Sequence, residues 1–389
     1  MIKPRDLKLP REEHTLTGPL CEIHADDPDV SHLALVDFAL NQDDVPLLLT
    51  YDSDSLLTRC GDGGWSHHFP GNRRLNAMAL MPDGSTVLGG KIADVCLLTK
   101  IGADGTEAWT KSIGETGKNR CEISSVGSDA AGNVYVAAVV HDALPGETGA
   151  GTSYLLALVA KYDATGNQLW IWHPQLPTPR DNWGATANFD PIPTLATDPS
   201  GGVVVTLNAA LVRLDAGGAE TWRSAVQPSM LLSPSPTVTE DGQIYVAWGP
   251  YLMKVDTDGE ILDLVRYVVS QEITDAEGTT WKAELKNSSL NRSGVVIAGD
   301  TIIFHGIVTN QWSYGAALPT HDALLVGKFS RDLTEGGAYQ VIAGPSKVIG
   351  LLGAPIIRID THGKPILAAF HTPGSTLALG GLVSVLRVE

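Results

Sequence analysis

Short apolar strands and tight polar turns alternate along almost the whole chain. Each unit consists of a strand, an Asp/Gly turn, a second strand, a gap, a third strand ending in a basic residue, and another Asp/Gly turn. The apolar runs are rich in Val, Ile and Leu, and they do not keep the 3.6-residue period of an amphipathic helix. Strands of this kind, separated by turn residues that favour positive φ, predict antiparallel hairpins and exclude a solenoid of helices.

The third strand of the unit recurs seven times, and each copy carries one base: Arg59, Lys100, Lys161, Arg213, Lys254, Lys328 and Arg387. The shortest spacing is 41 residues, from Arg59 to Lys100 and again from Arg213 to Lys254. A four-stranded meander with this period is typical of a propeller blade. We therefore predict an all-β, seven-bladed β-propeller with blades at about 31–70, 74–115, 121–174, 190–228, 233–270, 290–343 and 353–389.

The seventh predicted blade lacks a fourth strand, because its third strand runs to Glu389. An unpaired strand edge is a liability that proteins usually cover. The segment around residues 15–23 belongs to no blade and is the natural donor of the missing strand. We predict an N-terminal arm over residues 1–30 that closes the ring, followed by a single propeller domain over residues 31–389.

A tryptophan follows the second turn of the first four units, and we expect these side chains to pack between neighbouring sheets: Trp65, Trp109, Trp170 and Trp222. The segments 129–140 and 158–172 of the third unit resemble bacterial β-propeller repeats and the blades of pyrroloquinoline-quinone-type quinoproteins. In those blades a tryptophan near the end docks on the next blade. The resemblance spans about residues 31–389, and it implies a fold far more than a function.

The chemistry of the quinoprotein dehydrogenases is not expected here. Those enzymes resemble larger, eight-bladed, exported proteins with a calcium site and often an adjacent-cysteine ring, and this chain has no such cysteine pair. The stretch 256–260 lacks the later ligands of a calcium loop. The histidines show no metal-ligand spacing, and acidic pairs such as Asp43 and Asp44 fall in turns. We expect no cofactor, no metal and no catalytic residue.

Charge and composition exclude two classes of partner. The chain has 27 basic and 44 acidic residues and a net charge of −17, which excludes a broad surface for nucleic acid. No apolar run approaches the ~20 residues that span a bilayer, so no membrane insertion is expected. The polar N-terminus lacks the apolar core of a secretory signal, which predicts a chain that is cytoplasmic when made. We expect its four cysteines to be free thiols: Cys21, Cys60, Cys96 and Cys121.

Long inserts fall only between strands two and three or between blades, at 141–154, 171–191, 268–290 and 309–322. In a meander these connections emerge on one face, and loops on a rigid scaffold often carry recognition. The inserts contain aromatic and polar residues outside the repeat positions, and aromatic residues and Arg are enriched at binding hot spots. The candidate binding residues are Trp172, His173, Arg180, Trp183, Trp281, Trp312, Tyr314 and His321.

The sequence thus favours a non-catalytic structural subunit that recognises other proteins of a larger assembly, or a glycan, through its insert-rich face. A bacteriophage virion or tail component is the specific expectation, by analogy. The alternative is an enzyme, a lyase or hydrolase, with its site at the mouth of the central channel. A scaffold of the WD40 sort ranks last, because the GH…WD pattern is missing.

Overall fold

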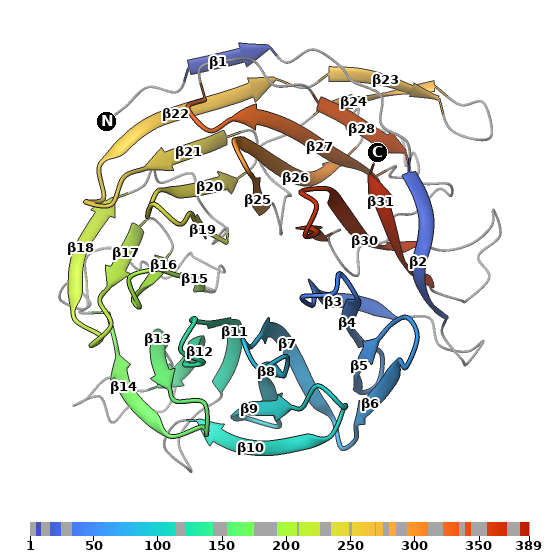
Figure 1. Cartoon of the computed structure of the whole chain (residues 1–389). Coiled ribbons are helices and arrows are strands. Elements are labelled where there is room, and N and C mark those ends of the chain that lie inside the picture. The colour runs from blue at the N-terminus through green and yellow to red at the C-terminus, as the bar shows by residue number, and fades with distance from the viewer. Residues whose placement is uncertain are drawn as a thin grey trace. The chain divides into compact units, whose positions relative to one another are not determined.

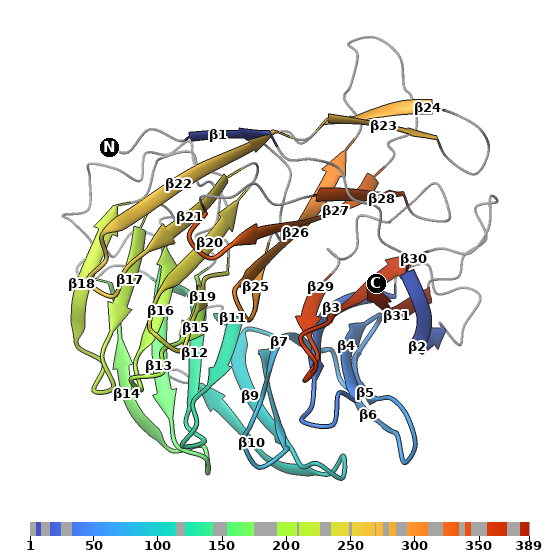
Figure 2. The same ribbon diagram turned by 45° about the horizontal axis from the view of Figure 1, so that its top comes forward.

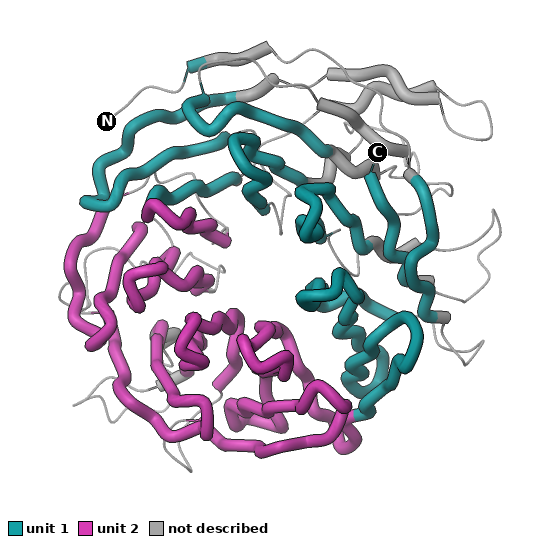
Figure 3. The backbone as a smooth tube through the Cα atoms, viewed as in Figure 1, with its two compact units in different colours: residues 1–68, 243–389 teal, residues 69–242 magenta. Residues whose placement is uncertain are grey.

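The computed structural model describes residues 5–8, 16–24, 33–113, 121–142, 154–174, 193–207, 210–225, 235–248, 251–268, 270–274, 280–284, 294–309, 322–333, 339–343, 356–371 and 382–388. These residues contain 31 strands and no helix. The predicted fold class is confirmed: the chain is an all-β, seven-bladed β-propeller with four antiparallel strands in each blade. Contacts between residues divide it into two units, residues 1–68 with 243–389 (unit 1) and residues 69–242 (unit 2), which Figure 3 colours separately.

Unit 2 holds three complete blades, each with its strands in sequence order. Blade two consists of β7 (Arg73–Leu80), β8 (Thr86–Ile92), β9 (Val95–Ile101) and β10 (Glu107–Ile113). Blade three consists of β11 (Cys121–Ser128), β12 (Val134–Asp142), β13 (Tyr154–Tyr162) and β14 (Gln168–Trp172). Blade four consists of β15 (Thr194–Thr197), β16 (Val203–Leu207), β17 (Ala210–Leu214) and β18 (Glu220–Ala225), and β19 (Thr237–Val238) ends the unit.

Unit 1 contains the remaining blades. Blade one consists of β3 (Ala34–Leu40), β4 (Pro46–Tyr51), β5 (Ser55–Arg59) and β6 (Trp65–Phe69). Blade five begins with β19 and continues in unit 1 with β20 (Ile244–Trp248), β21 (Tyr251–Val255) and β22 (Ile261–Val268). Blade six consists of β25 (Gly294–Ala298), β26 (Thr301–Thr309), β27 (Asp322–Ser330) and β28 (Tyr339–Ala343), and blade seven has β29 (Ile356–Ile359), β30 (Pro365–His371) and β31 (Leu382–Val388).

The fourth strand of blade seven comes from the N-terminal arm, as the sequence predicted. Strand β2 (Leu16–His24) pairs antiparallel with β31, with Cys21 opposite Val385, and Figures 1 and 2 show the two strands side by side. A second arm strand was not predicted: β1 (Arg5–Lys8) adds in parallel to β22 of blade five. The guanidinium of Arg5 holds it there, 2.7 Å from the carboxylate of Asp263. The hairpin of β23 (Ser270–Thr274) and β24 (Thr280–Glu284) was also not predicted.

The Asp/Gly turns form because aspartate side chains accept hydrogen bonds from the turn amides. In the turn between β11 and β12, the Oδ1 atom of Asp129 accepts from the amides of Ala131 and Asn133, at 3.0 and 2.8 Å. Gly132 adopts a φ of 80° in this turn, which glycine reaches without steric cost. The same hydrogen bonds recur at Asp163, Asp198, Asp215, Asp256 and Asp360, so the turns that separate the strands of a blade can be recognised in the sequence.

In unit 2, the repeated basic residue of the third strand forms an ion pair with an aspartate of the turn between strands one and two. Lys161 is buried with its ammonium 3.6 Å from Asp129 and 4.7 Å from the centre of the Tyr135 ring. In the neighbouring blades of unit 2, Lys100 lies 2.8 Å from Asp83 and Arg213 lies 2.7 Å from Asp198. Burial alone would raise the pKa of Asp129, but hydrogen bonds from Asn133 and the charge of Lys161 hold that pKa below its ordinary value. The bases therefore stabilise the blades from within.

The expected docking of tryptophans on the next blade is seen twice in unit 2. The indole Nε1 of Trp109 in blade two donates to the carbonyl of Ala164 in blade three, at 3.3 Å. Trp170 in blade three donates in the same way to Ala216 in blade four, at 2.9 Å. Both side chains are half-buried rather than enclosed in the core, because one edge of each ring meets a surface turn.

The expectation of free thiols was wrong, because the four cysteines form two disulfides. Cys21 of β2 is bonded to Cys60, which follows β5, so the closing strand is covalently attached to blade one. Cys96 of β9 is bonded to Cys121 at the start of β11, which joins blades two and three. Neither pair has the short spacing of a local motif, and the partners meet only because neighbouring blades stand side by side within each unit.

Candidate functional site

The longest connections between strands lie at the same end of their blades. In unit 2, all six connections between strands one and two or three and four span five residues each: 81–85, 102–106, 129–133, 163–167, 198–202 and 215–219. The connections at the other ends include 114–120, 143–153, 173–193 and 226–236. In unit 1 the longest ones, 269–293, 310–321, 344–355 and 372–381, lie at the corresponding ends. We call these the insert-bearing ends of the blades.

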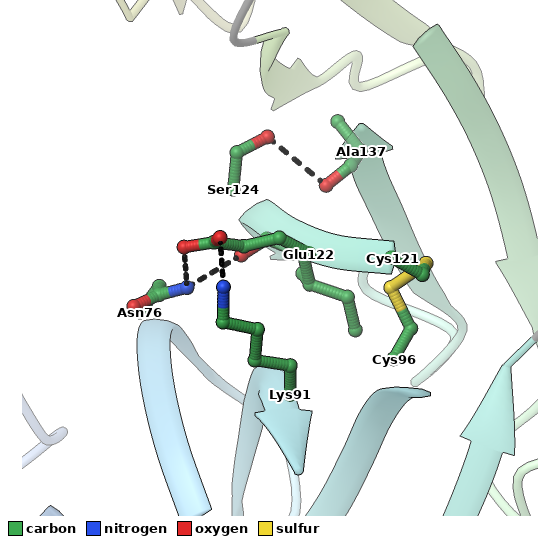
Figure 4. Close-up of a disulfide and its surroundings, with 8 residues drawn as sticks. Asn76, Lys91, Cys96, Cys121, Glu122, Ser124 and Ala137 are labelled. Carbon is green, nitrogen blue, oxygen red and sulfur yellow. Dashed lines mark hydrogen bonds and ion pairs between the residues drawn. A yellow bond between two sulfur atoms is a disulfide. The ribbon is translucent and has the colours of Figure 1, made fainter. Parts of the chain in front are cut away.

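A charged cluster lies at the insert-bearing ends of blades two and three (Figure 4). The carboxylate of Glu122, on β11, accepts a hydrogen bond from the ammonium of Lys91 at 2.5 Å and from the side-chain amide of Asn76 at 2.8 Å. Asn76 lies on β7 and Lys91 near the end of β8, so three strands of two blades contribute. The amide of Asn76 also donates to the carbonyl of Ile123, at 3.2 Å. Because β7 and β11 are first strands, the cluster lies at the inner side of these two blades.

The Cys96–Cys121 disulfide fixes the strand that carries Glu122. Cys121 directly precedes Glu122 on β11, and Figure 4 shows the disulfide beside the cluster. Both cysteines are buried, at 0% and 7% exposure, whereas the side chains of Lys91 and Glu122 are 29% and 40% exposed. A buried covalent link under a half-exposed ion pair holds the charged groups in place while leaving them open to a ligand.

Two serines extend this arrangement to blade four. The hydroxyl of Ser124 donates to the carbonyls of Ala137 at 3.2 Å and Pro193 at 2.6 Å, and the latter residue directly precedes β15. The amide of Leu195 donates to the hydroxyl of Ser125, at 3.3 Å. The first strands of blades three and four are thus tied near their insert-bearing ends.

Two of the predicted binding residues have described side chains. Trp172, the last residue of β14, is half-buried and packs against the hydrophobic cluster shared by blades three and four. His173 follows it and is exposed. Trp281 belongs to β24, but its side chain lies outside the described residues. The other predicted binding residues lie outside the described residues altogether: Arg180, Trp183, Trp312, Tyr314 and His321.

Unit 1 brings one histidine and two carboxylates together where a turn of blade seven meets a turn of blade one. Ligand atoms of Asp44, Asp360 and His362 lie within 4.8 Å of one another. The carboxylate of Asp44 accepts from the amide of Thr361 at 2.8 Å and from its hydroxyl at 2.5 Å. Burial alone would raise the pKa of Asp44, but the hydrogen bonds from Thr361 hold that pKa below its ordinary value. These hydrogen bonds join the turn of blade one to the turn of blade seven, so the three residues have a structural role as a link between the two blades.

Unit 1 has another polar contact between inner strands. Arg358 on β29 contacts Asp37 on β3, with 3.2 Å between the guanidinium and the carboxylate. The nearby His305 of β26 is fully buried, and its Nδ1 atom has no hydrogen-bond partner. Its imidazole occupies the space above Gly294, where an added Cβ would lie 2.4 Å from Nε2. Burial and the charge of Arg358 lower the pKa of His305 to about 3.

The cluster of Asn76, Lys91 and Glu122 was not predicted from the sequence. Its members come from three strands and form no motif. No local pattern in the sequence could have found it, because the three residues meet only when β7, β8 and β11 pack side by side.

Comparisons with known proteins support the fold and nothing finer. No family model matches the chain, and no curated protein does. Similar solved structures include the WD40 domain of Pan2 from Neurospora crassa, with 9% identity over 97% of both chains and a TM-score of 0.53. A protein from Lactobacillus plantarum (12% identity, 86% and 91% covered, TM-score 0.45) and a gluconolactonase from Xanthomonas campestris (14%, 75% and 97%, 0.38) are more distant. At such identities, the likeness to the Pan2 domain shows a shared β-propeller fold alone.

Proposed function

We propose that this protein is a non-catalytic β-propeller subunit that binds another protein, or a glycan, through the insert-bearing ends of its blades. The observation that carries the proposal is the uneven length of the connections. Five-residue turns close one end of every blade in unit 2, and the long connections leave from the other end. In a propeller these ends share one face, and long loops on a rigid scaffold are where such proteins place recognition.

The base of these loops is reinforced, which favours binding by a pre-organised surface. In blades two and three the Cys96–Cys121 disulfide, the Lys91–Glu122 ion pair and the hydrogen bonds of Ser124 all lie at the insert-bearing ends. The carboxylate of Glu122 is engaged by both Lys91 and Asn76. A carboxylate held this way is better suited to present a fixed charge to a ligand than to transfer a proton, so we favour binding over the enzyme alternative.

The setting that we propose is an oxidising one, because disulfides persist outside the reducing cytosol, including on virion surfaces. A bacteriophage virion or tail component fits this setting, by analogy. We also propose that the blades are of the pyrroloquinoline-quinone-type repeat, in a non-enzymatic member. The docking of Trp109 and Trp170 on the following blades supports that proposal.

Gentle purification from the native source, followed by identification of the chain or glycan that co-purifies, supplies the ligand for the test. Its dissociation constant is then measured for the Trp183→Ala and Trp312→Ala variants. We expect a loss of affinity of about tenfold or more for at least one of them, since buried aromatic anchors dominate interface energies. Leu262→Ala is the control, because Leu262 is an exposed apolar side chain on an outer strand. Unchanged affinity in both tryptophan variants would refute the proposal.

A further inference from the structure

The outer strand of blade three exposes a pair of large apolar side chains. Leu169 and Ile171 on β14 are 53% and 42% exposed. They alternate with Trp170 and Trp172, which face the other side of the sheet and pack against the cluster of blades three and four. Successive residues of a strand point to opposite faces, so the exposed pair forms a continuous apolar stripe.

Other outer strands with described side chains carry no pair of large apolar residues on the corresponding face. Strand β18 has Thr221 and Arg223 beside its tryptophan, β10 has Ala108 and Thr110, and β6 exposes Ser66 and His68. Strand β22 exposes Leu262, at 47%, but its next residue on that face, Leu264, is buried. Among the described outer strands, β14 therefore stands out by its adjacent pair of exposed aliphatic residues, which marks an interaction surface.

The backbone edge of β14 is also open. The order of this sheet is β11-β12-β13-β14, so β14 has a neighbour on one side only. In unit 1 the chain covers two comparable edges with its own arm, placing β1 on β22 and β2 on β31. Among the described residues no strand does the same for β14, and an apolar open edge is a ready template for pairing.

The distribution of charge along the chain favours a second copy of this chain as the partner of the β14 edge. The chain carries a net charge of −17, so two copies repel each other over most of their surfaces. Between Asp163 and Arg180, however, there is no Asp, Glu, Lys or Arg. A second copy can approach along this uncharged stretch without placing like charges together.

The stripe is also self-complementary. If two β14 strands pair antiparallel with Trp170 opposite its own copy, Leu169 of one chain lies opposite Ile171 of the other. Residues directly opposite in an antiparallel pair share a face, so four aliphatic side chains would form one cluster. Such an isologous contact closes after two copies and does not extend into a fibre.

We propose that β14 is a homodimer edge, where two copies of this chain pair antiparallel about Trp170 and join their third blades into one continuous sheet. Two five-residue strands bury less than the ~1,600 Å² of a standard interface. The dimer is therefore weak, and it forms at concentrations on the order of micromolar and above.

Sedimentation velocity of the full chain over a wide concentration range tests the proposal. We expect a concentration-dependent shift from monomer to dimer, and at least a tenfold higher dissociation constant for Leu169→Lys. The matched control is Leu262→Lys, since both leucines directly precede the residue that pairs with the third-strand base, and both are about half exposed. A chain that remains monomeric throughout, or a dimer weakened equally by both substitutions, would overturn the proposal.

A crosslinking experiment tests the register independently. Leu169→Cys and Ile171→Cys chains are prepared separately, then oxidised alone and as a mixture. The antiparallel register places position 169 opposite position 171, so the mixture should give several times more disulfide-linked dimer than either variant alone. Equal yields in all three samples, or no crosslinked dimer, would contradict the pairing about Trp170.

Discussion

The indole of Trp170 and the carbonyl of Ala216 form a 2.9 Å hydrogen bond that joins the outer strand of blade three to a hairpin turn of blade four. The turn fits the ring because its fourth residue is Gly218, where an added Cβ would lie 2.7 Å from Cδ2 of Trp170. The turn thus reverses the direction of the chain and also provides a surface without a side chain, on which the tryptophan of the preceding blade packs.

Gly218→Ala should lower the free energy of unfolding by about 2–4 kcal/mol, because it adds a clash with Trp170 to the cost of a positive φ. Gly363→Ala is the matched control. Gly363 has a φ of 76°, but nothing lies within 4 Å of its added Cβ, so its cost should be about 1 kcal/mol. Urea unfolding measures both. Equal losses of unfolding free energy in the two variants would show that the packing of Trp170 on Gly218 contributes nothing to stability.

Lys161→Ala should destabilise the protein more than Lys91→Ala, although the Lys91 ion pair is shorter. Lys161 and Asp129 are 8% and 10% exposed at 3.6 Å, whereas Lys91 and Glu122 are 29% and 40% exposed at 2.5 Å. Removing Lys161 leaves a buried carboxylate without its countercharge, at a cost of about 3 kcal/mol or more. Removing a partly exposed partner costs about 1 kcal/mol or less. The reverse order of urea midpoints would contradict this account.

Replacing Cys21 and Cys60 by serine should release β2 from the seventh blade. The disulfide closes a loop of 39 residues, and its loss should cost about 4 kcal/mol through the entropy of the unfolded chain. Hydrogen exchange of the β2 amides should accelerate as well. The Cys96/Cys121 double serine variant is the control, because it loses a loop of 25 residues in the other unit and should leave β2 protected. Unaltered exchange of β2 in the first variant would show that the strand is held by pairing alone.

Stability should fall as the pH drops from about 7 to 5, and His305 should account for part of the fall. Burial keeps its folded pKa at about 3, against 6.5 when exposed. The unfolded chain therefore binds a proton below pH 6.5 that the folded chain does not, and stability decreases by up to about 1.4 kcal/mol per pH unit. His305→Leu should flatten the urea midpoints between pH 7 and 5. His362→Leu, at a residue whose side chain is 78% exposed, is the control. An unchanged slope in the His305 variant would exclude this residue as the source.

The blades were predictable from the sequence because their signals are local. A turn such as Asp129–Gly132 and a third-strand base such as Lys161 recur with each unit, so strand order and blade limits follow from patterns a few residues long. The role of β2 was predictable for a different reason: the count of strands left the last blade incomplete, and only one unassigned segment could complete it.

The disulfides and the Asn76–Lys91–Glu122 cluster could not be predicted in the same way. Four cysteines permit three pairings, and spacing favours none of them. Cys21 and Cys60 meet because β2 sits against blade one, and Glu122 meets Lys91 because β11 stands beside β8. Such contacts depend on how separate sheets pack, which local patterns of residues do not encode. Strand β1 was missed for the same reason, since its four residues resemble any polar segment.

The pairing of β2 with β31 has a consequence for how the protein is made. Val385 follows Cys21 by 364 positions, and a ribosome adds about 5–20 residues per second. The N-terminal segment therefore waits for tens of seconds before β31, the strand with which it pairs, emerges. Blades whose strands are consecutive can form during that time, but the last sheet cannot. Assembly of the propeller thus ends with a single late docking event, and a chaperone acting on the nascent chain would exert its greatest influence there.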